Sequence, residues 1–158
     1  MSYSHNSQDL HVVPCLAPVD IAAATTTSDV IDAGDCQHVQ FLVFFGALDV
    51  NGVLNVYNCL NPALGTPAAI TEFTYRWSAV TGTDLMGAPA AGMLNVVVTA
   101  ATHAGAVLVI DIEPAGLTDG LPYCYVEYNP TAGAANLLCI VALVTPRYSQ
   151  EIVPSVVD

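Results

Sequence analysis

The sequence has very little charge, and almost none of it is positive. Charged residues make up 10% of the 158 residues, and 14 acidic residues are opposed by two basic ones, Arg76 and Arg147. The net charge is therefore −12. A nucleic-acid-binding protein neutralises phosphates with clusters of lysine and arginine, so this sequence predicts no nucleic-acid partner. Its acidity instead favours a basic protein surface as partner.

Long apolar runs are also missing, although hydrophobic residues make up 54% of the chain. The most apolar run, residues 137–144, is far shorter than the roughly 20 residues that a transmembrane helix needs. We therefore predict no membrane partner. A monomer usually keeps a charged surface for solubility, so this composition indicates a surface that copies of the protein or another partner cover.

Motifs for catalysis, metal binding and cofactor binding are absent as well. The sequence contains neither a Gly-x-Ser-x-Gly elbow nor a glycine-rich phosphate loop. Asp29, Asp32 and Asp35 recur every third residue, which is typical of turn capping and does not match a calcium loop. No zinc-ligand spacing connects the histidines His5, His11, His38 and His103. We predict a protein that is not an enzyme and has no metal or cofactor.

Two groups of residues leave a chemical alternative open. Glu113 and Glu127 are candidates for the carboxylate pair of a glycoside hydrolase, and the simpler interpretation is that both are exposed acids on strands or turns. Trp77, Tyr75 and Tyr125 are candidates for a sugar-stacking face, whereas aromatic residues in strands more often belong to a core.

The five cysteines are odd in number and widely spaced: Cys15, Cys36, Cys59, Cys124 and Cys139. Residues 1–6 lack the basic and apolar segments of a secretory signal peptide. We therefore expect reduced thiols in the core of a protein that is made in a cytoplasm.

Residues 38–47 are the best candidate for a central strand. One parity of this stretch carries β-branched or aromatic residues at every second position, as a strand needs to cover one face: Val39, Phe41, Val43 and Phe45. The other parity is mostly apolar too, which predicts that both faces of the strand are covered. The turn at Asn51-Gly52, between this strand and the next apolar run, predicts a β-hairpin.

Short strands separated by Gly, Pro, Asn and Asp turns account for most of the remaining chain. The clearest candidates are residues 30–32, 53–59, 73–80, 94–99, 106–112, 123–128 and 137–144. This pattern predicts an all-β fold, an antiparallel β-sandwich of jelly-roll type. Prolines near both ends predict extended arms, which divides the chain into an N-terminal arm (1–19), a sandwich domain (20–146) and a C-terminal tail (147–158).

Several of these segments resemble a family of small all-β virion proteins of tailed bacteriophages. In that family an "Ile-Asp-x-x-Gly" turn precedes a Val/Phe strand ending in Gly-Ala, and the later half has a Tyr strand, an aliphatic strand and a Pro-Arg-Tyr end. The corresponding residues here are Val30 to Gly34, where one residue instead of two separates Asp32 from the glycine, and Val39 to Ala47, Tyr123 to Tyr128, Leu137 to Val144, and Pro146 to Tyr148. The likeness covers about residues 20–150.

The resemblance implies a non-enzymatic decoration, or cement, protein that binds the outer surface of a phage head and stabilises the capsid lattice. It also implies the major capsid protein as partner, self-association as a homotrimer, synthesis in the host cytoplasm and a place on the capsid surface of the virion. The alternative is a tail- or fibre-associated protein or a minor coat protein that binds a host glycan or another structural protein.

Apolar residues in the proline-punctuated ends are the predicted contacts with the capsid or a neighbouring protomer. Such segments are suited to adding a strand to the edge of a neighbour's sheet. The alternative is that they close their own domain. The predicted contact residues are Leu10, Val12, Val13, Tyr148, Ile152 and Val153.

Overall fold

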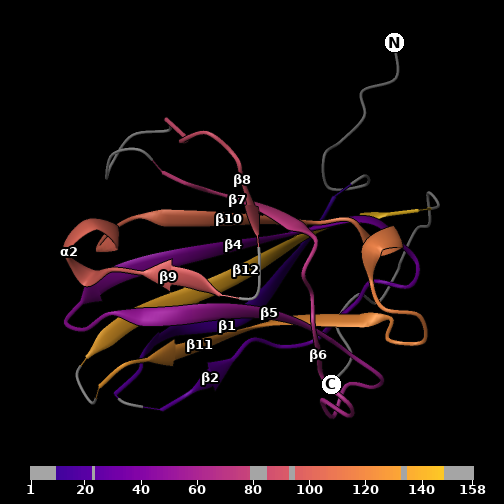
Figure 1. Cartoon of the computed structure of the whole chain (residues 1–158), viewed down its shortest axis with the longest axis horizontal. Helices are drawn as coiled ribbons and strands as arrows, with labels where there is room; N and C mark the ends of the chain where they lie inside the picture. Colours follow the sequence, from indigo (N-terminus) through magenta and orange to yellow (C-terminus); the bar gives the residue numbers. More distant parts are fainter. Residues whose placement is uncertain (1–9, 23, 79–84, 93–94, 133–134, 148–158) are drawn as a thin grey trace.

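The chain forms a sandwich of two antiparallel sheets in a computed structural model that describes residues 10–22, 24–78, 85–92, 95–132 and 135–147 (Figure 1). Sheet A contains, in spatial order, β1 (His11–Asp20), β12 (Asn136–Pro146), β4 (Cys36–Leu48), β10 (Val107–Ile112), β7 (Phe73–Trp77) and β8 (Ala90–Gly92). Sheet B contains β2 (Thr26–Thr27), β11 (Tyr123–Pro130), β5 (Gly52–Cys59) and β6 (Ala68–Ala69), with β3 (Ile31–Asp32) paired to β11 and β9 (Val96–Val98) paired to β5.

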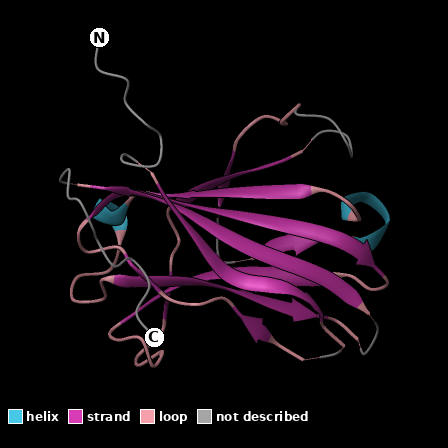
Figure 2. Cartoon of the chain, turned by 180° about the vertical axis from the view of Figure 1, so that it is seen from behind, coloured by secondary structure: helices cyan, strands magenta, loops and turns pink. Residues whose placement is uncertain are grey.

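The order of pairing confirms the predicted all-β, jelly-roll-like sandwich. The first strand, β1, pairs with the last, β12. The other pairs are nested between these two in the sequence: β2 and β3 pair with β11, β4 with β10, and β5 with β9. These nested pairs alternate between sheet A and sheet B, as in a long hairpin rolled into two layers. Two short helices, α2 (Ala100–His103) and η1 (Pro114–Gly116), lie at opposite ends of the sandwich (Figure 2).

The predicted central strand is confirmed as β4, which lies between β12 and β10. Its inward side chains are almost fully buried, with Val39, Phe41 and Val43 0% exposed. The expectation that both faces are covered is wrong, because Phe44 on the other parity is 40% exposed. A sheet in an antiparallel sandwich packs on its partner sheet with one face only, and the apolar second parity of β4 does not change that arrangement.

The turn at Asn51-Gly52 does not form the predicted hairpin, because β4 and β5 belong to different sheets. The Asn136 side chain accepts hydrogen bonds from the backbone N–H groups of Asp49 (3.1 Å) and Val50 (3.4 Å), and this directs the chain across the sandwich. Gly52 is needed for a close approach: a Cβ atom there would overlap the phenol ring of Tyr128.

The remaining predicted strands are found with shifted bounds. Residues 123–128 lie in β11, 137–144 in β12 and 106–112 mostly in β10, while 94–99 shortens to β9 and 73–80 to β7 among the described residues. The boundary at residue 19 differs from the structure, since β1 begins at His11. It pairs with β12 from His11 opposite Val144 to Asp20 opposite Leu137, so these residues are part of the sandwich.

Four of the five cysteines are buried, as expected for core thiols, and Cys139 is partly exposed; all five are free. Burial raises the pKa of Cys15 to about 12 and that of Cys36 to about 11. Burial also raises the pKa of Cys124 well above its ordinary value. These thiols therefore stay protonated at neutral pH, and a protonated, buried thiol is a poor nucleophile.

This burial predicts selective thiol labelling. In the folded protein at about pH 8, iodoacetamide is expected to modify Cys139 first, and the other four cysteines are expected to react only after unfolding in urea. Peptide mass spectrometry measures the order of labelling, and Cys139→Ser is the control that should leave the folded protein almost unlabelled. Rapid labelling of Cys15 or Cys124 in the folded protein would contradict the burial described here.

A candidate docking face on sheet A

The outer face of sheet A carries a continuous group of apolar side chains. Alternation along β4, β10 and β12 points every second side chain away from the core. Neither short helix covers this face (Figure 2). We call the group the apolar zone, and its residues are Val19, Leu42, Phe44, Val107, Val109, Leu137, Cys139 and Val141.

The strand register brings these residues together. Leu42 on β4 lies opposite Val109 on β10 and opposite Val141 on β12. One step along the sheet, Phe44 lies between Val107 and Cys139 in the same way. Side chains directly opposite each other on one face of an antiparallel pair are in contact range, so the zone crosses three strands without a break.

A hollow of about 300 Å³ lies at one side of the zone, with Pro18, Val19, Phe44, Leu137 and Cys139 among the residues that line it. Two of its side chains are substantially exposed, Phe44 at 40% and Leu137 at 45%. Gly46 also lines the hollow, and a Cβ atom there would lie 2.8 Å from the Cβ of Leu137, so the glycine leaves room for that leucine over β4. The hollow is large enough for one apolar side chain of a partner.

Charged groups on the same face are gathered at its other end. Asp111 accepts a hydrogen bond from Nε2 of Gln40 at 2.6 Å, and its carboxylate lies 3.5 Å from Arg76 and 3.5 Å from His38. His38 is also 4.0 Å from Glu113, whose side chain is 76% exposed. This polar end therefore contains Arg76, one of the two arginines of the chain. The residues of the apolar zone are themselves uncharged, and two charged residues border them: Asp20 lies opposite Leu137, and Arg76 lies opposite Val109.

The edges of sheet A are poorly suited to strand addition. The outer strand β1 contains Pro14 and Pro18, which have no N–H to donate, and the carbonyl of Cys15 already accepts a hydrogen bond from Asp29 at 2.8 Å. At the opposite edge, β8 is only three residues long. These features favour contact through the face of the sheet over contact through its edges.

The structure places the predicted contact residues as follows. Val12 is 65% exposed, Leu10 is partly buried, and Val13 is 5% exposed and packs in the core. Val13 therefore closes its own domain, which is the alternative considered for these residues. Tyr148, Ile152 and Val153 lie outside the described residues.

Both described ends of the chain nevertheless lie at one end of the sandwich. The first residue of β1, His11, lies opposite Val144, close to the end of β12. At the other end of the chain, Pro146 is paired with Cys36 at the start of β4. The described chain therefore starts and ends beside the polar end of sheet A.

The two chemical alternatives from the sequence are not brought together. Glu113 follows β10 of sheet A, whereas Glu127 lies on β11 of sheet B. Trp77 is on β7 of sheet A, away from Tyr125 on β11, and its ring stacks on His103 with centroids 3.8 Å apart. Burial lowers the pKa of His103, which is consistent with a packing role.

The described residues show turn capping at the predicted aspartate series, where Asp32 accepts a hydrogen bond from the N–H of Gly34 at 3.0 Å. Within the same part of the chain, no three His, Cys, Asp or Glu side chains are grouped as metal ligands. No described helix is long and apolar enough to cross a membrane.

The apolar second parity of β4 is the sequence signal for the apolar zone. The second parity of β4 predicted a second covered face, whereas Leu42 and Phe44 lie on the outer surface, as do alternate residues of the aliphatic strand β12. Distinguishing the two cases requires knowing whether another layer packs outside the sheet, and periodicity within one strand does not contain that information.

No protein-family model and no curated protein matches this sequence. The structure is similar to that of the SPBc2 prophage-derived protein YomS, with 11% sequence identity, a TM-score of 0.42, and coverage of 86% of this chain and 92% of that chain. It is also similar to a chain of the infectious bursal disease virus VP2 subviral particle, with 13% identity and a TM-score of 0.28. That match covers 87% of this chain and 40% of the viral chain. Both similarities are too distant to transfer a function to this chain.

Proposed function

We propose that the protein is a non-enzymatic virion protein that decorates the outer surface of a phage head, with the apolar zone of sheet A docked on the major capsid protein. Two features of the chain support this proposal. The first is the sequence resemblance to phage virion proteins, which includes the central strand β4 and the aliphatic strand β12. The second, which carries the proposal, is an exposed zone of apolar side chains on a protein with a net charge of −12.

The energetic reasoning starts from this lack of charge. Burying apolar surface contributes about 25 cal/mol per Å² before the costs of association are subtracted. Burying an unpaired charge would oppose that gain, and the apolar zone has none to bury. Elsewhere the acidic surface repels other acidic surfaces, so the zone is the part of this protein best suited to close contact with a partner.

The polar end of the face and the two terminal segments extend the proposed contact. Glu113 is available for a basic group of the capsid protein, because its side chain is 76% exposed. Leu10 and Val12, together with Tyr148, Ile152 and Val153, are proposed to contact the capsid or a neighbouring protomer, since His11 and Pro146 both lie at this end. Assembly as a homotrimer would multiply these contacts and stabilise the capsid lattice against internal pressure.

Phe44→Asp is expected to lower the occupancy of the protein on phage particles at least about tenfold, because it places an unpaired charge in the centre of the docking face. The measurement is the copy number per particle, from stained gels of purified virions that carry the wild-type or the variant protein. The wild-type protein is expected at a copy number comparable with that of the capsid subunits.

Val97→Asp is the matched control, since Val97 is, like Phe44, an exposed apolar residue in a strand (61% exposed) but lies on sheet B. It is expected to keep wild-type occupancy. Full occupancy by Phe44→Asp would show that the apolar zone does not dock on the capsid. A wild-type copy number of only a few per particle would instead indicate the tail- or fibre-associated alternative, and particles that fail to assemble without the protein would indicate a minor coat protein.

A further inference from the structure

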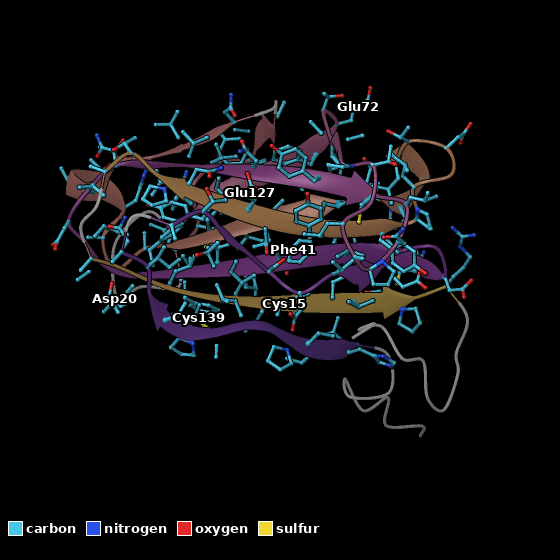
Figure 3. All side chains as sticks on the ribbon, turned by 90° about the horizontal axis from the view of Figure 1, so that it is seen from below. Cys15, Asp20, Phe41, Glu72, Glu127 and Cys139 are labelled. Carbon is cyan, nitrogen blue, oxygen red and sulfur yellow. The ribbon has the colours of Figure 1, made fainter. Side chains whose placement is uncertain are left out.

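The outer face of sheet B differs from that of sheet A, because it combines tyrosines with amide and carboxylate side chains. On the neighbouring strands β5 and β11, Tyr57 lies opposite Tyr125, and Asn55 lies opposite Glu127. On both strands these four residues alternate with residues whose side chains face the core, so the four side chains point outward. In Figure 3, Glu127 and Cys139 lie toward opposite sides of the molecule, so this group is remote from the apolar zone of sheet A.

Asn55 has a buried hydrogen-bond acceptor without a partner. The residue is 8% exposed, and its side-chain oxygen has no hydrogen bond to any of the described residues. Buried polar atoms in folded proteins are almost always hydrogen-bonded, and an exception needs an explanation such as a ligand that supplies the missing donor. Its position opposite Glu127 puts this acceptor within the polar group of the outer face.

Hydrogen bonds hold the neighbouring polar groups in place. Asn129 donates from Nδ2 to the Glu127 carboxylate at 2.7 Å, and the hydroxyl of Thr25 donates to the side-chain oxygen of Asn129. Asn129 and Glu127 lie on the same face of β11, two residues apart. The carboxylate and the amide are therefore positioned before any ligand arrives, which reduces the entropy cost of binding.

The two tyrosines provide an aromatic surface beside this network. Their rings stack with centroids 5.4 Å apart and an interplanar angle of 24°. Tyr125 is buried at 3% exposure, while Tyr57 is partly exposed above it. Burial raises the pKa of Tyr57 and also raises that of Tyr125 to about 12, and the nearby Glu127 carboxylate adds to both shifts. Both phenols therefore stay protonated at neutral pH and can donate a hydrogen bond.

We propose that this group, formed by Asn55, Tyr57, Tyr125, Glu127 and Asn129, is a binding site for a neutral carbohydrate. The apolar C–H face of a sugar ring packs on the exposed side of Tyr57. Ring hydroxyls donate to the Asn55 oxygen and to the Glu127 carboxylate, and they accept from the Asn129 amide.

Charge decides between this ligand and its competitors. An anionic ligand, such as a phosphate or an acidic sugar, would be repelled by Glu127 and would find neither arginine, because Arg76 is on β7 of sheet A and Arg147 follows β12. A basic peptide would pair with Glu127, and its binding in place of a sugar is therefore one outcome of the experiment. A neutral sugar meets all of these groups, and the site is independent of the docking proposed for sheet A.

The experiment is saturation-transfer NMR on the full-length protein with glucose, galactose, mannose, rhamnose and N-acetylglucosamine as probes. At least one sugar is expected to show transfer from the wild-type protein. For that sugar, Glu127→Gln and Tyr57→Leu are each expected to weaken binding about tenfold. Glu127→Gln removes the charged hydrogen-bond acceptor, and Tyr57→Leu removes the aromatic ring on which the sugar stacks. Tyr75→Leu, a tyrosine change on sheet A, is expected to bind like the wild type.

Asn55→Leu separates a binding role from a structural one. Leucine has a similar volume and removes the unpaired buried acceptor, so the melting temperature is expected to stay the same or rise, while sugar binding weakens about tenfold. The proposal is overturned if no sugar shows transfer, if Tyr57→Leu binds the sugar like the wild type, or if a lysine-rich peptide binds this face and the sugars do not.

Discussion

Phe41→Ala is expected to lower the free energy of unfolding by about 3–5 kcal/mol. Phe41 is 0% exposed and lies between the two sheets at the centre of β4 (Figure 3). Removing its ring takes a large apolar group out of the core and leaves a cavity that strands held by hydrogen bonds on both sides cannot close. Urea unfolding followed by the fluorescence of Trp77, the single tryptophan, measures the change.

Phe44→Ala is the matched control, because it removes the same ring from the other face of the same strand. Phe44 is 40% exposed, and its substitution is expected to change the free energy of unfolding of the isolated protein by less than about 1 kcal/mol. Similar losses from the two variants would mean that both faces of β4 are buried, contrary to the structure.

Asn136→Ala is expected to lower the free energy of unfolding by about 2–4 kcal/mol, a large effect for a polar residue. The side chain of Asn136 is fully buried, accepts hydrogen bonds from the N–H groups of Asp49 and Val50, and donates to the hydroxyl of Tyr128 at 3.3 Å. Alanine leaves these groups without their partner where the chain crosses from sheet A to sheet B.

Asn61→Ala is the corresponding control in an exposed loop. The side chain of Asn61 accepts a hydrogen bond from the N–H of Gly65 at 3.1 Å, where water can replace it. Its loss is expected to cost about 0.5 kcal/mol. If Asn136→Ala is as mild as Asn61→Ala in the same urea experiment, the crossing is held by the surrounding strands and Asn136 contributes little.

Most strands were predictable because their information is local. The β-branched and aromatic residues at every second position of β4 specify an extended chain with one buried face, whatever the partner strands are. Prolines at positions 14 and 18 restrict β1 to an edge in the same way, and the structure places it there. The antiparallel sandwich followed from many such strands with few helical segments.

The turn at Asn51-Gly52 shows where local information is insufficient. Its residue types are those of a two-residue hairpin, but the hydrogen bonds that position it come from Asn136, which is 85 residues away in the sequence. A contact of such long range depends on the completed pairing of β12 with β4, so no window around the turn contains it.

The candidate sites also include some that local sequence information could indicate and others that depend on long-range strand pairing. The sequence pointed to the terminal segments, and it placed Trp77, Tyr75 and Tyr125 in one possible sugar-stacking face, because residue type alone marked them. The structure separates these aromatics and instead pairs Tyr57 with Tyr125, since β5 and β11 are neighbours in sheet B. Pairing between distant strands decides which exposed side chains share a face.

Four features of this protein are encoded locally in its sequence: the class of fold, the central strand, the buried thiols and the shortage of charge. Each of these depends on composition or on the period-two pattern of a single segment. The packing of the two sheets selects which apolar parity faces the core and which forms the outer surface. That choice depends on whether a second layer covers the sheet, and here sheet B covers one face of sheet A and leaves Phe44 and Leu137 exposed on the other.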